Sequence, residues 1–477
     1  MTENYWSKEE AETEFPPINS LLSELSDPEV AEEEFRADFF QGLAGRRQKA
    51  AFLLMTIWLV IITLHLVSWG IWLVLSFTTL AGIQILRYLF TKPDKIPPVL
   101  SDSELADAPK VSLLVAAKNE EAVIENLLAM LCTLDYPEDK YEVWAIDDHS
   151  TDNTPAILDQ LAQEYPQLKV VHRAANAGGG KSGALNQIIP QTFGDIIGVF
   201  DADAKVTNDL LRNVVPLFAA QDMGAVQVRK AIANSTENFW TKGQAAEMAL
   251  DSYVQQQRIA VGGIGELRGN GQFVSRTALD SCGGWNEETI TDDLDLTIRL
   301  HLDNWKIGFL LTPPVLEEGV TNANSLWHQR NRWAEGGYQR YLDYWRYIFR
   351  TPMGFGKRID LLCWMLLQYI VPAANVPDGV MAIARHRLPL LSPITALLFV
   401  WGFVGMFRGL IRIQASSGKA INLPLLLNIA GQSWRGLIYM LHWQIVMLSI
   451  TVRMSVRPKR LKWVKTVHEG TTSFNNG

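Results

Sequence analysis

The chain has 477 residues, too many for one ordinary domain, and its 48% hydrophobic residues, 20% charged residues and 16 tryptophans are typical of a membrane protein. Its cysteines, Cys132, Cys282 and Cys363, are far apart, which argues against a disulfide framework or a zinc site and fits a reducing, cytoplasmic setting. The net charge of −8 is concentrated at the start, where residues 1–40 carry twelve Asp and Glu against two basic residues. We expect residues 1–45 to be a disordered acidic tail, which lacks the basic start of a signal peptide.

The first two apolar segments are residues 50–67 and 71–90, each about the 20 residues that a helix needs to cross a bilayer. A short Ser-Trp-Gly turn joins them, so they predict a transmembrane helical hairpin within residues 46–92. Basic residues flank both ends of this hairpin, namely Arg46, Arg47, Lys49, Arg87, Lys92 and Lys95. Because cytoplasmic flanks are enriched in Lys and Arg, we expect both ends, and the domain that follows, to be cytoplasmic.

Residues 109–350 change to alternating strand and helix patterns. Apolar runs predict strands at 111–115, 141–148, 168–172 and 196–203, and an amphipathic helix is expected at 120–131. Strands that alternate with helices favour an α/β domain with a Rossmann-like, mostly parallel sheet. In such a sheet the binding site lies at the carboxyl ends of the strands.

Two acidic pairs fall at these strand ends. Asp147 and Asp148 end the second strand, where carboxylates can accept hydrogen bonds from the base or ribose of a nucleotide. Asp201 and Asp203 end the fourth, and we expect their two carboxylates to point to opposite sides of an extended segment. We expect Asp203 to bind a divalent metal and Asp201 to contact the donor. Mg²⁺ suits this sparse supply of carboxylates because it also takes diphosphate oxygens and water, and Mn²⁺ could replace it.

A glycine-rich segment, Gly-Gly-Gly-Lys-Ser at 178–182, imitates a phosphate-binding P-loop. The full pattern needs glycine where this chain has Ala175, and no second NTPase element follows. We interpret the segment as a glycine loop that opens a helix and brings Lys181 near the phosphates or sugar of a donor.

Two later segments carry further groups that transfer from a sugar diphosphate needs. Thr-Asp-Asp at 291–293 starts an amphipathic helix, and Asp293 is the candidate base for deprotonating an incoming hydroxyl. The segment 329–333 reads Gln-Arg-Asn-Arg-Trp, and its arginines are expected to neutralise a leaving diphosphate. Its expected donor-binding residues are Gln329, Arg330, Arg332 and Trp333.

The chain becomes apolar again at 361–383, 388–413 and 423–452. The first run is interrupted by prolines and the third contains Gln, Arg and His, so we expect residues 351–455 to form two full crossings and one segment lying on the surface. The basic tail, 456–477, is expected to be cytoplasmic and to contact anionic lipids.

With these motifs the chain resembles the membrane-bound branch of glycosyltransferase family 2. The segment with Lys118 and Glu120 is similar to the family's opening strand motif, and 181–186 to its Lys-x-Gly-x-x-Asn segment. Asp147 and Asp148 match the family's nucleotide-binding pair, and Asp201 and Asp203 match its metal motif. Gln329, Arg332 and Trp333 match its Gln-x-x-Arg-Trp motif. The family's catalytic pair is commonly Glu-Asp, whereas here it is Asp292 and Asp293, which keeps the catalytic second position.

The resemblance implies a GT-A fold over about residues 109–350, a UDP-sugar donor, Mg²⁺ and inversion at the anomeric carbon, with Lys118 and Glu120 among the donor-binding residues. Over its whole length the chain resembles the glycolipid-forming members of the family. That likeness implies UDP-glucose as donor, diacylglycerol in the bilayer as acceptor, and a plasma or thylakoid membrane location. We expect no nucleic-acid partner.

Two alternatives remain open from the sequence. A processive polysaccharide synthase of the cellulose or hyaluronan type shares every motif, but exporting a polymer needs a polar channel through several crossings, and the C-terminal apolar runs are few. A membrane scaffold with a degenerate, ligand-sensing transferase domain is disfavoured because all the acidic motif residues are present.

Overall fold

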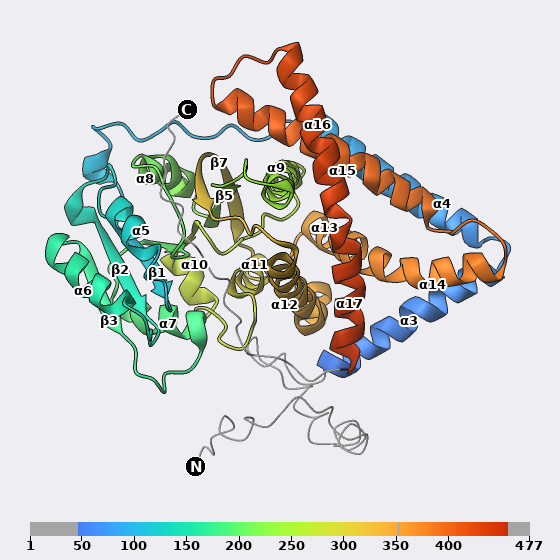
Figure 1. Ribbon diagram of the computed structural model, residues 1–477, viewed down its shortest axis with the longest axis horizontal. Helices are drawn as coiled ribbons and strands as arrows, with labels where there is room; N and C mark the ends of the chain where they lie inside the picture. Colours follow the sequence, from blue (N-terminus) through green and yellow to red (C-terminus); the bar gives the residue numbers. More distant parts are fainter. Residues whose placement is uncertain (1–45, 352, 457–477) are drawn as a thin grey trace.

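The computed structural model describes residues 46–351 and 353–456. The acidic segment 1–45 and the basic tail after Val456 therefore lie outside the described residues. Within them, an α/β domain stands beside a set of long apolar helices (Figure 1).

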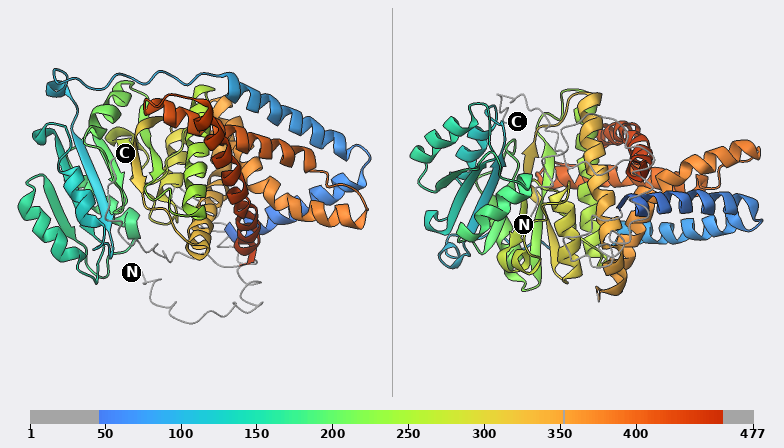
Figure 2. Two further views of the ribbon diagram at one scale, coloured as in Figure 1. Left: turned by 45° about the horizontal axis from the view of Figure 1, so that its top comes forward. Right: turned by 90° about the horizontal axis from the view of Figure 1, so that it is seen from below.

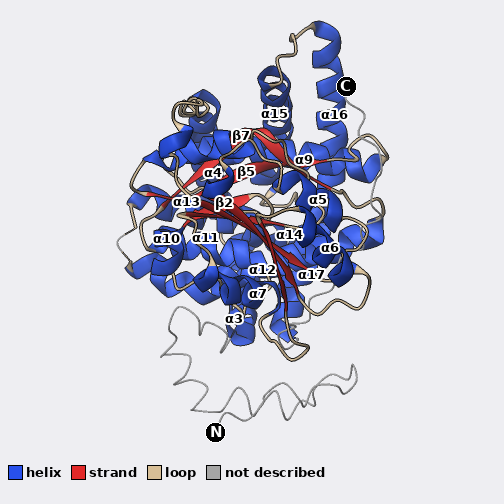
Figure 3. Ribbon diagram, turned by 90° about the vertical axis from the view of Figure 1, so that its left-hand side faces the viewer, coloured by secondary structure: helices blue, strands red, loops and turns tan. Residues whose placement is uncertain are grey.

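The α/β domain is built on one twisted sheet of seven strands in the order β3-β2-β1-β4-β6-β5-β7 (Figure 3). Only β6 runs antiparallel to its neighbours, so the expected mostly parallel sheet is confirmed. The strands are β1 Val111–Ala117, β2 Tyr141–Asp147, β3 Leu168–His172, β4 Ile196–Phe200, β5 Met223–Ile232, β6 Gln272–Ser275 and β7 Lys306–Glu317.

Both faces of the central strands are buried, which explains their nearly continuous apolar sequences. In β1, Leu113 and Val115 face a core completed by α5, α6 and α8, whereas Leu114 faces a second core with α7, α10 and α11. These helices are α5 Ile124–Leu131, α6 Thr154–Glu164, α8 Leu210–Val214, α7 Gly180–Ile188, α10 Arg276–Ser281 and α11 Asp292–Leu302. Short helices in the connections are η1 Leu105–Asp107, η2 Glu138–Lys140, η3 Ile189–Gln191 and η4 Val215–Ala219.

Two long helices, α9 Phe239–Ala260 and α12 Ala323–Arg350, join the sheet to the apolar helices. On one side α9 contacts β5 and α12 contacts α11; on the other, α9 packs against α15 and α16, and α12 against α17. Most tyrosines of α12 are buried in this packing, among them Tyr338, Tyr341 and Tyr344. These tyrosines therefore serve mainly as core.

Five helical segments among the described residues are long and apolar enough to cross a membrane. They comprise α3 Arg46–Leu66, α4 Gly70–Phe90, α13 Phe355–Met365 continued by the π-helical turn η5 Leu366–Ile370 into α14 Val371–Ala384, α15 Ser392–Ser416, and the pair α16 Leu423–Met440 and α17 His442–Val456. The hairpins α3–α4 and α14–α15 extend to the same side, away from the sheet (Figures 1 and 2). The third C-terminal run is broken at Leu441, and α17 runs across the base of the hairpins.

The far ends of the two hairpins are tied together by a buried polar contact. His65 Nε2 of α3 lies 2.7 Å from Asp378 Oδ1 of α14. Asp378 also accepts hydrogen bonds from the backbone N–H groups of Leu390 (2.8 Å) and Leu391 (3.0 Å), just before α15. One carboxylate therefore fixes the turn of the second hairpin against the first.

Candidate active site

A single cavity of about 2780 Å³ opens along the carboxyl ends of the strands and continues between the apolar helices. Ten of the twelve site residues expected from the sequence line it: Lys118, Glu120, Asp148, Lys181, Asp201, Asp203, Asp293, Gln329, Arg332 and Trp333. The other two, Asp147 and Arg330, do not belong to its lining. Motifs as far apart in the chain as Lys118 and Trp333 thus meet at one place.

Asp201 and Asp203 lie on a turn directly after β4. The expected strand 196–203 stops at Phe200, because Ala204 N–H donates back to the Asp201 carbonyl at 3.0 Å. Both residues line the cavity. The expectation of opposite sides had a wrong premise, because residues two apart in an extended strand share a face and the segment here is a turn. Asp203 Oδ2 accepts a hydrogen bond from Glu318 N–H at 3.1 Å, which fixes it against the end of β7.

Lys181, in the first turn of α7, connects the glycine loop to this acidic turn. Its Nζ lies 2.5 Å from Asp201 Oδ1. Burial works to lower the pKa of Lys181, but Asp201, Asp292 and Asp293 raise it above its usual range, so the amine remains a cation. A cation held among three acids at a helix N-terminus is suited to binding a diphosphate.

The loop before α7 needs glycine for reasons visible in the structure. Gly179 has φ of +80°, and a Cβ there would lie 2.3 Å from Glu287 Oε2. Asn186, further along α7, donates to the Trp285 carbonyl (2.8 Å) and to Glu287 (2.9 Å) and accepts from Trp285 N–H (2.9 Å). Asn186 therefore holds the loop that precedes Asp292 and Asp293 against the glycine loop.

The two members of the first acidic pair have different surroundings. Asp148 lines the cavity, pairs with Arg173 and lies 4.0 Å from Lys118 Nζ. Asp147, the last residue of β2, is buried; it accepts from Ser150 N–H at 3.0 Å and contacts His172 at 3.1 Å. Asp148 therefore lies on the cavity wall and Asp147 in the turn beneath it.

Asp293 lies at the start of α11 on the cavity wall. Burial raises the pKa of Asp293 to about 6, and the charge of Asp292 adds to this, although the Leu294 N–H opposes it. A Cβ on Gly269 would lie 3.4 Å from Asp293 Oδ2, so a bare backbone segment with φ of +78° faces the carboxylate. A carboxylate with a raised pKa is suited to accepting a proton near neutral pH.

The two arginines of the segment 329–333 face opposite sides of α12. Arg332 lines the cavity, where burial lowers its pKa while Asp201 and Asp293 oppose the shift. Arg330 is fully buried and does not line the cavity; its guanidinium carbon lies 4.0 Å from the centre of the Trp333 ring, and its Nη2 lies 2.6 Å from Glu247 Oε2 and 3.2 Å from the Tyr439 hydroxyl. Arg330 thus connects α12 to α9 and α16. It was expected among the donor-binding residues, but it is not part of the cavity lining.

Several charged residues of the cavity were missed by the sequence interpretation. Lys230 pairs with Glu317 at 2.8 Å and lies 5.2 Å from the centre of the Trp333 ring. Both belong to strand ends, Lys230 near the end of β5 and Glu317 as the last residue of β7. Binding residues lie at the carboxyl ends of the strands in such a sheet. A prediction of β5 and β7 would therefore have pointed to Lys230 and Glu317.

The acidic turn fits a divalent cation that is held mainly by a substrate. Among the described residues no group of three or more His, Cys, Asp or Glu side chains could hold an ion by themselves, so an ion here would need ligands from a bound molecule. Asp203 on the turn after β4 supplies the hard oxygen ligand that Mg²⁺ and Mn²⁺ prefer, and Lys181 and Arg332 face the space where phosphates would complete the shell.

The other half of the cavity is apolar and is formed by the membrane-type helices. Its walls come from α4, α13, η5, α14, α15, α16 and α17. Representative lining residues are Leu80, Ile83, Trp364, Leu367, Leu398, Phe399, Leu437, Leu441 and Met447. Phe399 and Leu441 also belong to the exposed large hydrophobic residues, as do Leu80 and Ile83 of α4.

Comparison with known proteins agrees with this architecture. Residues 109–336 match the family model described as glycosyltransferase like family 2. Beta-monoglucosyldiacylglycerol synthase of Synechocystis sp. is 59% identical over 470 residues, covering 98% of this chain and 97% of that protein. The protein of the same name from Nostoc sp. is 58% identical and covers 99% of this chain and 100% of its own.

A solved structure shows the same fold at low sequence identity. The mannosyltransferase PcManGT from Pyrobaculum calidifontis, determined with GDP-mannose and Mn²⁺, is 20% identical with a TM-score of 0.54, covering 83% of this chain and 98% of that one. The expected GT-A fold flanked by apolar helices is therefore confirmed. With a near-full-length relative at 59% identity and the fold and motifs in place, the chain belongs to glycosyltransferase family 2.

Proposed function

We propose that the protein transfers glucose from UDP-glucose to the free hydroxyl of 1,2-diacylglycerol, giving β-monoglucosyldiacylglycerol and UDP. Relatives that match over nearly the whole chain carry the name of that reaction's enzyme. The observation that carries the proposal is the single cavity, which joins a polar, charged half at the strand ends to an apolar half between the membrane-type helices. A sugar nucleotide suits the first half, and a lipid with a terminal hydroxyl suits the second.

Asp293 is placed to act as the base of an inverting displacement. Its carboxylate takes the proton of the lipid hydroxyl while that oxygen forms a bond to the anomeric carbon. The bond from that carbon to the diphosphate oxygen breaks at the same time, and UDP leaves with the electron pair. Attack from the face opposite the leaving group converts the α-linked donor into a β-glucoside.

The negative charge that develops on the leaving diphosphate faces several cations of this chain. Lys181 and Arg332 line the donor half of the cavity, and Lys230 lies beside the Trp333 ring. Mg²⁺, or Mn²⁺ in its place, would be held by Asp203 and would neutralise diphosphate charge when bound. Asp148, Lys118 and Glu120, on the far side of the donor half, would contact the nucleotide, with Gln329 and Trp333 near the sugar and phosphates.

Several features support a cytoplasmic catalytic domain in a plasma or thylakoid membrane. The near ends of both hairpins carry many basic residues, among them Arg46, Arg47, Lys49, Arg87, Lys92, Lys95, Lys357, Arg358 and Lys419. The far turns, by contrast, carry only Arg385 and Arg387 among their Lys and Arg residues. Lys and Arg are enriched at the cytoplasmic ends of membrane helices, so this distribution indicates that the near ends of the hairpins are cytoplasmic. In this orientation α3, α4, α14 and α15 cross the bilayer, and α17 lies along its cytoplasmic surface.

The experiment is product analysis with the purified, membrane-reconstituted protein. UDP-glucose, Mg²⁺ and diacylglycerol should give a lipid with one glucose, and anomeric NMR should show a β-linkage without chain growth at high UDP-glucose. A long glycan would favour a processive synthase. An α-linkage, a water-soluble product or the absence of any lipid product would each contradict the proposal.

A further inference from the structure

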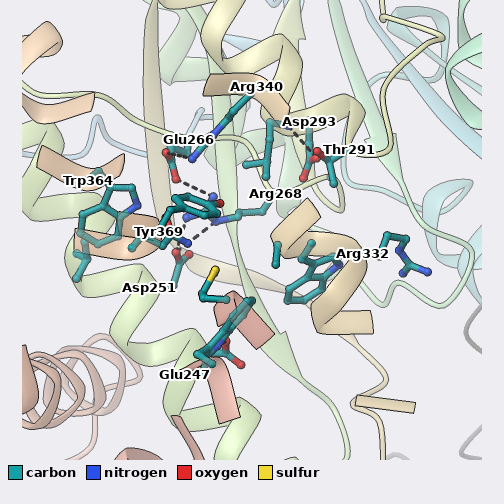
Figure 4. A pocket seen from close by; sticks show the side chains of 18 of the residues that line it. Glu247, Asp251, Glu266, Arg268, Thr291, Asp293, Arg332, Arg340, Trp364 and Tyr369 are labelled. Atoms are coloured by element: carbon teal, nitrogen blue, oxygen red, sulfur yellow. Dashed lines mark hydrogen bonds and ion pairs between the residues drawn. The ribbon is translucent and has the colours of Figure 1, made fainter. Parts of the chain in front are cut away.

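A polar cluster with two buried members stands where the two halves of the cavity meet, and the mechanism above does not use it. It consists of Glu266, Arg268, Arg340 and Gln368, all of which line the cavity; Figure 4 shows the first three. Arg340 Nη2 donates to Glu266 Oε1 at 3.0 Å, and Arg268 Nη1 lies 2.8 Å from Glu266 Oε2. We refer to these four residues as the neck cluster.

The neck cluster offers hydrogen-bonding groups that nothing in the described part of the chain satisfies. Arg340 is only 3% exposed, yet its Nε and Nη1 have no hydrogen-bond partner among the described residues. The buried Oε1 of Gln368 likewise has none there. Leaving such groups buried and unpaired costs free energy, which a ligand with suitably placed polar atoms would recover.

The backbone places Arg340 and Gln368 at the same junction. Gln368 lies in the π-helical turn η5, which interrupts the helix from Phe355 to Ala384, and such turns occur frequently at functional sites. The next residue, Tyr369, packs its ring 5.4 Å from Tyr338 and 5.8 Å from Tyr341 of α12, measured between ring centres. The turn of α12 that carries Arg340 is therefore in contact with the turn that carries Gln368.

We propose that Arg340 and Gln368 are positioning residues that bind the two ester groups of the diacylglycerol acceptor. This inference rests on the proposed function. Guanidinium N–H groups donate to ester carbonyls, and a half-turn about the last side-chain bond of Gln368 presents its Nε2 donor in place of Oε1. Holding the esters at the neck leaves the acyl chains in the apolar half and directs the glycerol hydroxyl towards Asp293.

The test compares a diester acceptor with a matched acceptor that lacks both carbonyls. Wild type, Gln368→Leu, Arg340→Lys and the control Gln432→Leu, which changes a glutamine of α16 outside the cavity lining, are assayed with 1,2-diacylglycerol and 1,2-dialkylglycerol of equal chain length. We expect wild type to favour the diester by about tenfold in kcat/KM, since two hydrogen bonds are at stake.

The substitutions should act on the diester alone. Gln368→Leu and Arg340→Lys should each lower its kcat/KM about threefold, so that together they account for the wild-type preference, with little change for the diether and with the KM for UDP-glucose within about twofold of wild type. Arg340→Lys keeps a cation beside Glu266 but loses donors, and Gln368→Leu removes no charge, so a folded protein is expected for at least the latter. Gln432→Leu should retain the wild-type preference.

The outcomes separate the inference from the function on which it rests. Equal use of diester and diether by wild type, or an equal loss on both lipids in Gln368→Leu, would overturn the ester-binding role while leaving the proposed function in place. No glucosylation of either lipid by wild type would contradict the proposed function and the inference with it.

Discussion

The two halves of the cavity are built in different ways. The donor half takes its residues from short segments at the ends of β1, β2, β4, β5 and β7, at the starts of α7 and α11, and from residues 329–333 of α12. The apolar half takes single residues from helices α4 and α13 to α17, whose first and last members are separated by most of the chain. The chemistry is thus encoded in local motifs on a rigid sheet, whereas acceptor selection depends on how the membrane-type helices pack.

This difference predicts which substitutions change catalysis and which change acceptor use. Changes in the donor half should lower turnover with any acceptor. Changes in the apolar half should alter the use of lipid while leaving donor binding intact. The expected effects below run from the largest to the smallest.

Asp293→Asn should have the largest effect, because it removes the only group that we assign as base. General-base catalysis contributes about 10²–10⁴-fold. We expect the upper part of that range here, so kcat should fall by about 10³-fold or more. UDP binding, measured by calorimetry, should remain within a few-fold of wild type, since Asp293 acts on the acceptor. Near-normal turnover in this variant would remove Asp293 from the mechanism.

Removing the metal or its ligand should weaken binding of the donor UDP-glucose. Chelation of divalent ions should stop transfer, and Asp203→Ala should weaken binding of UDP-glucose together with Mg²⁺ by roughly a hundredfold, as loss of a carboxylate–metal contact does. Restoring Mg²⁺ or Mn²⁺ should restore wild-type activity. Full activity in excess chelator would contradict the assignment of Asp203.

The two arginines of α12 should separate catalysis from stability. Arg332→Ala should lower kcat by about 10²-fold, the usual effect of removing a donor to developing negative charge, with little change in Tm. Arg330→Ala should instead leave Glu247 without its cation and lower the free energy of unfolding by about 3 kcal/mol. Thermal unfolding and kinetics of both variants check this, and a stable, inactive Arg330→Ala protein would show that Arg330 acts on the substrate.

A larger side chain in the apolar half of the cavity should change the KM for the lipid acceptor alone. Leu398→Trp on α15 projects a large ring into the cavity, so the KM for diacylglycerol should rise about tenfold, as expected for the overpacking of a well-filled site. Val400→Trp on the same helix, at a position 59% exposed and outside the lining, is the matched control. Equal kinetics in the two variants would mean that the acceptor does not use this half.

The pH profile should show the smallest effect. The base must be ionised, so kcat/KM for the acceptor should be constant at high pH and fall about tenfold per unit below the pKa of Asp293, which burial raises to about 6. Asp292→Asn removes a neighbouring negative charge, which lowers the pKa of Asp293 and moves the falling limb to lower pH. An unchanged limb in Asp292→Asn would assign it to another group.

Much of the donor half could be predicted because its residues follow from strand ends and helix starts. The third strand, Leu168–His172, and the start of α11 lie where the sequence placed them. The turn at Asp201 was missed because an apolar run does not show where a strand stops pairing. Arg330 was misplaced although helix periodicity gives a warning: residues two apart on a helix face different sides, so Arg330 and Arg332 could not both face the donor. The structure instead places Arg330 against the Trp333 ring.

The apolar half could not be predicted in the same way. Hydropathy identifies helices long enough to cross a membrane but does not say which of their faces meet. Tyr369 packing on Tyr338 and Tyr341, and with it the juxtaposition of Gln368 and Arg340, depends on a π-helical turn and on tertiary packing. His65 and Asp378 are likewise brought together across 313 residues of sequence.

The central claim is that the acceptor reaches Asp293 through the apolar half of the cavity. The most direct measurement is photo-crosslinking of the reconstituted Asp293→Asn protein, loaded with UDP and Mg²⁺, by a diacylglycerol with a diazirine in one acyl chain, followed by peptide mass spectrometry. The account predicts labels at cavity-lining residues such as Trp364, Leu398 and Leu441, which excess unlabelled diacylglycerol should remove. Labels confined to the exposed outer face of α3, at Phe52, Leu59 and Leu66, would contradict it.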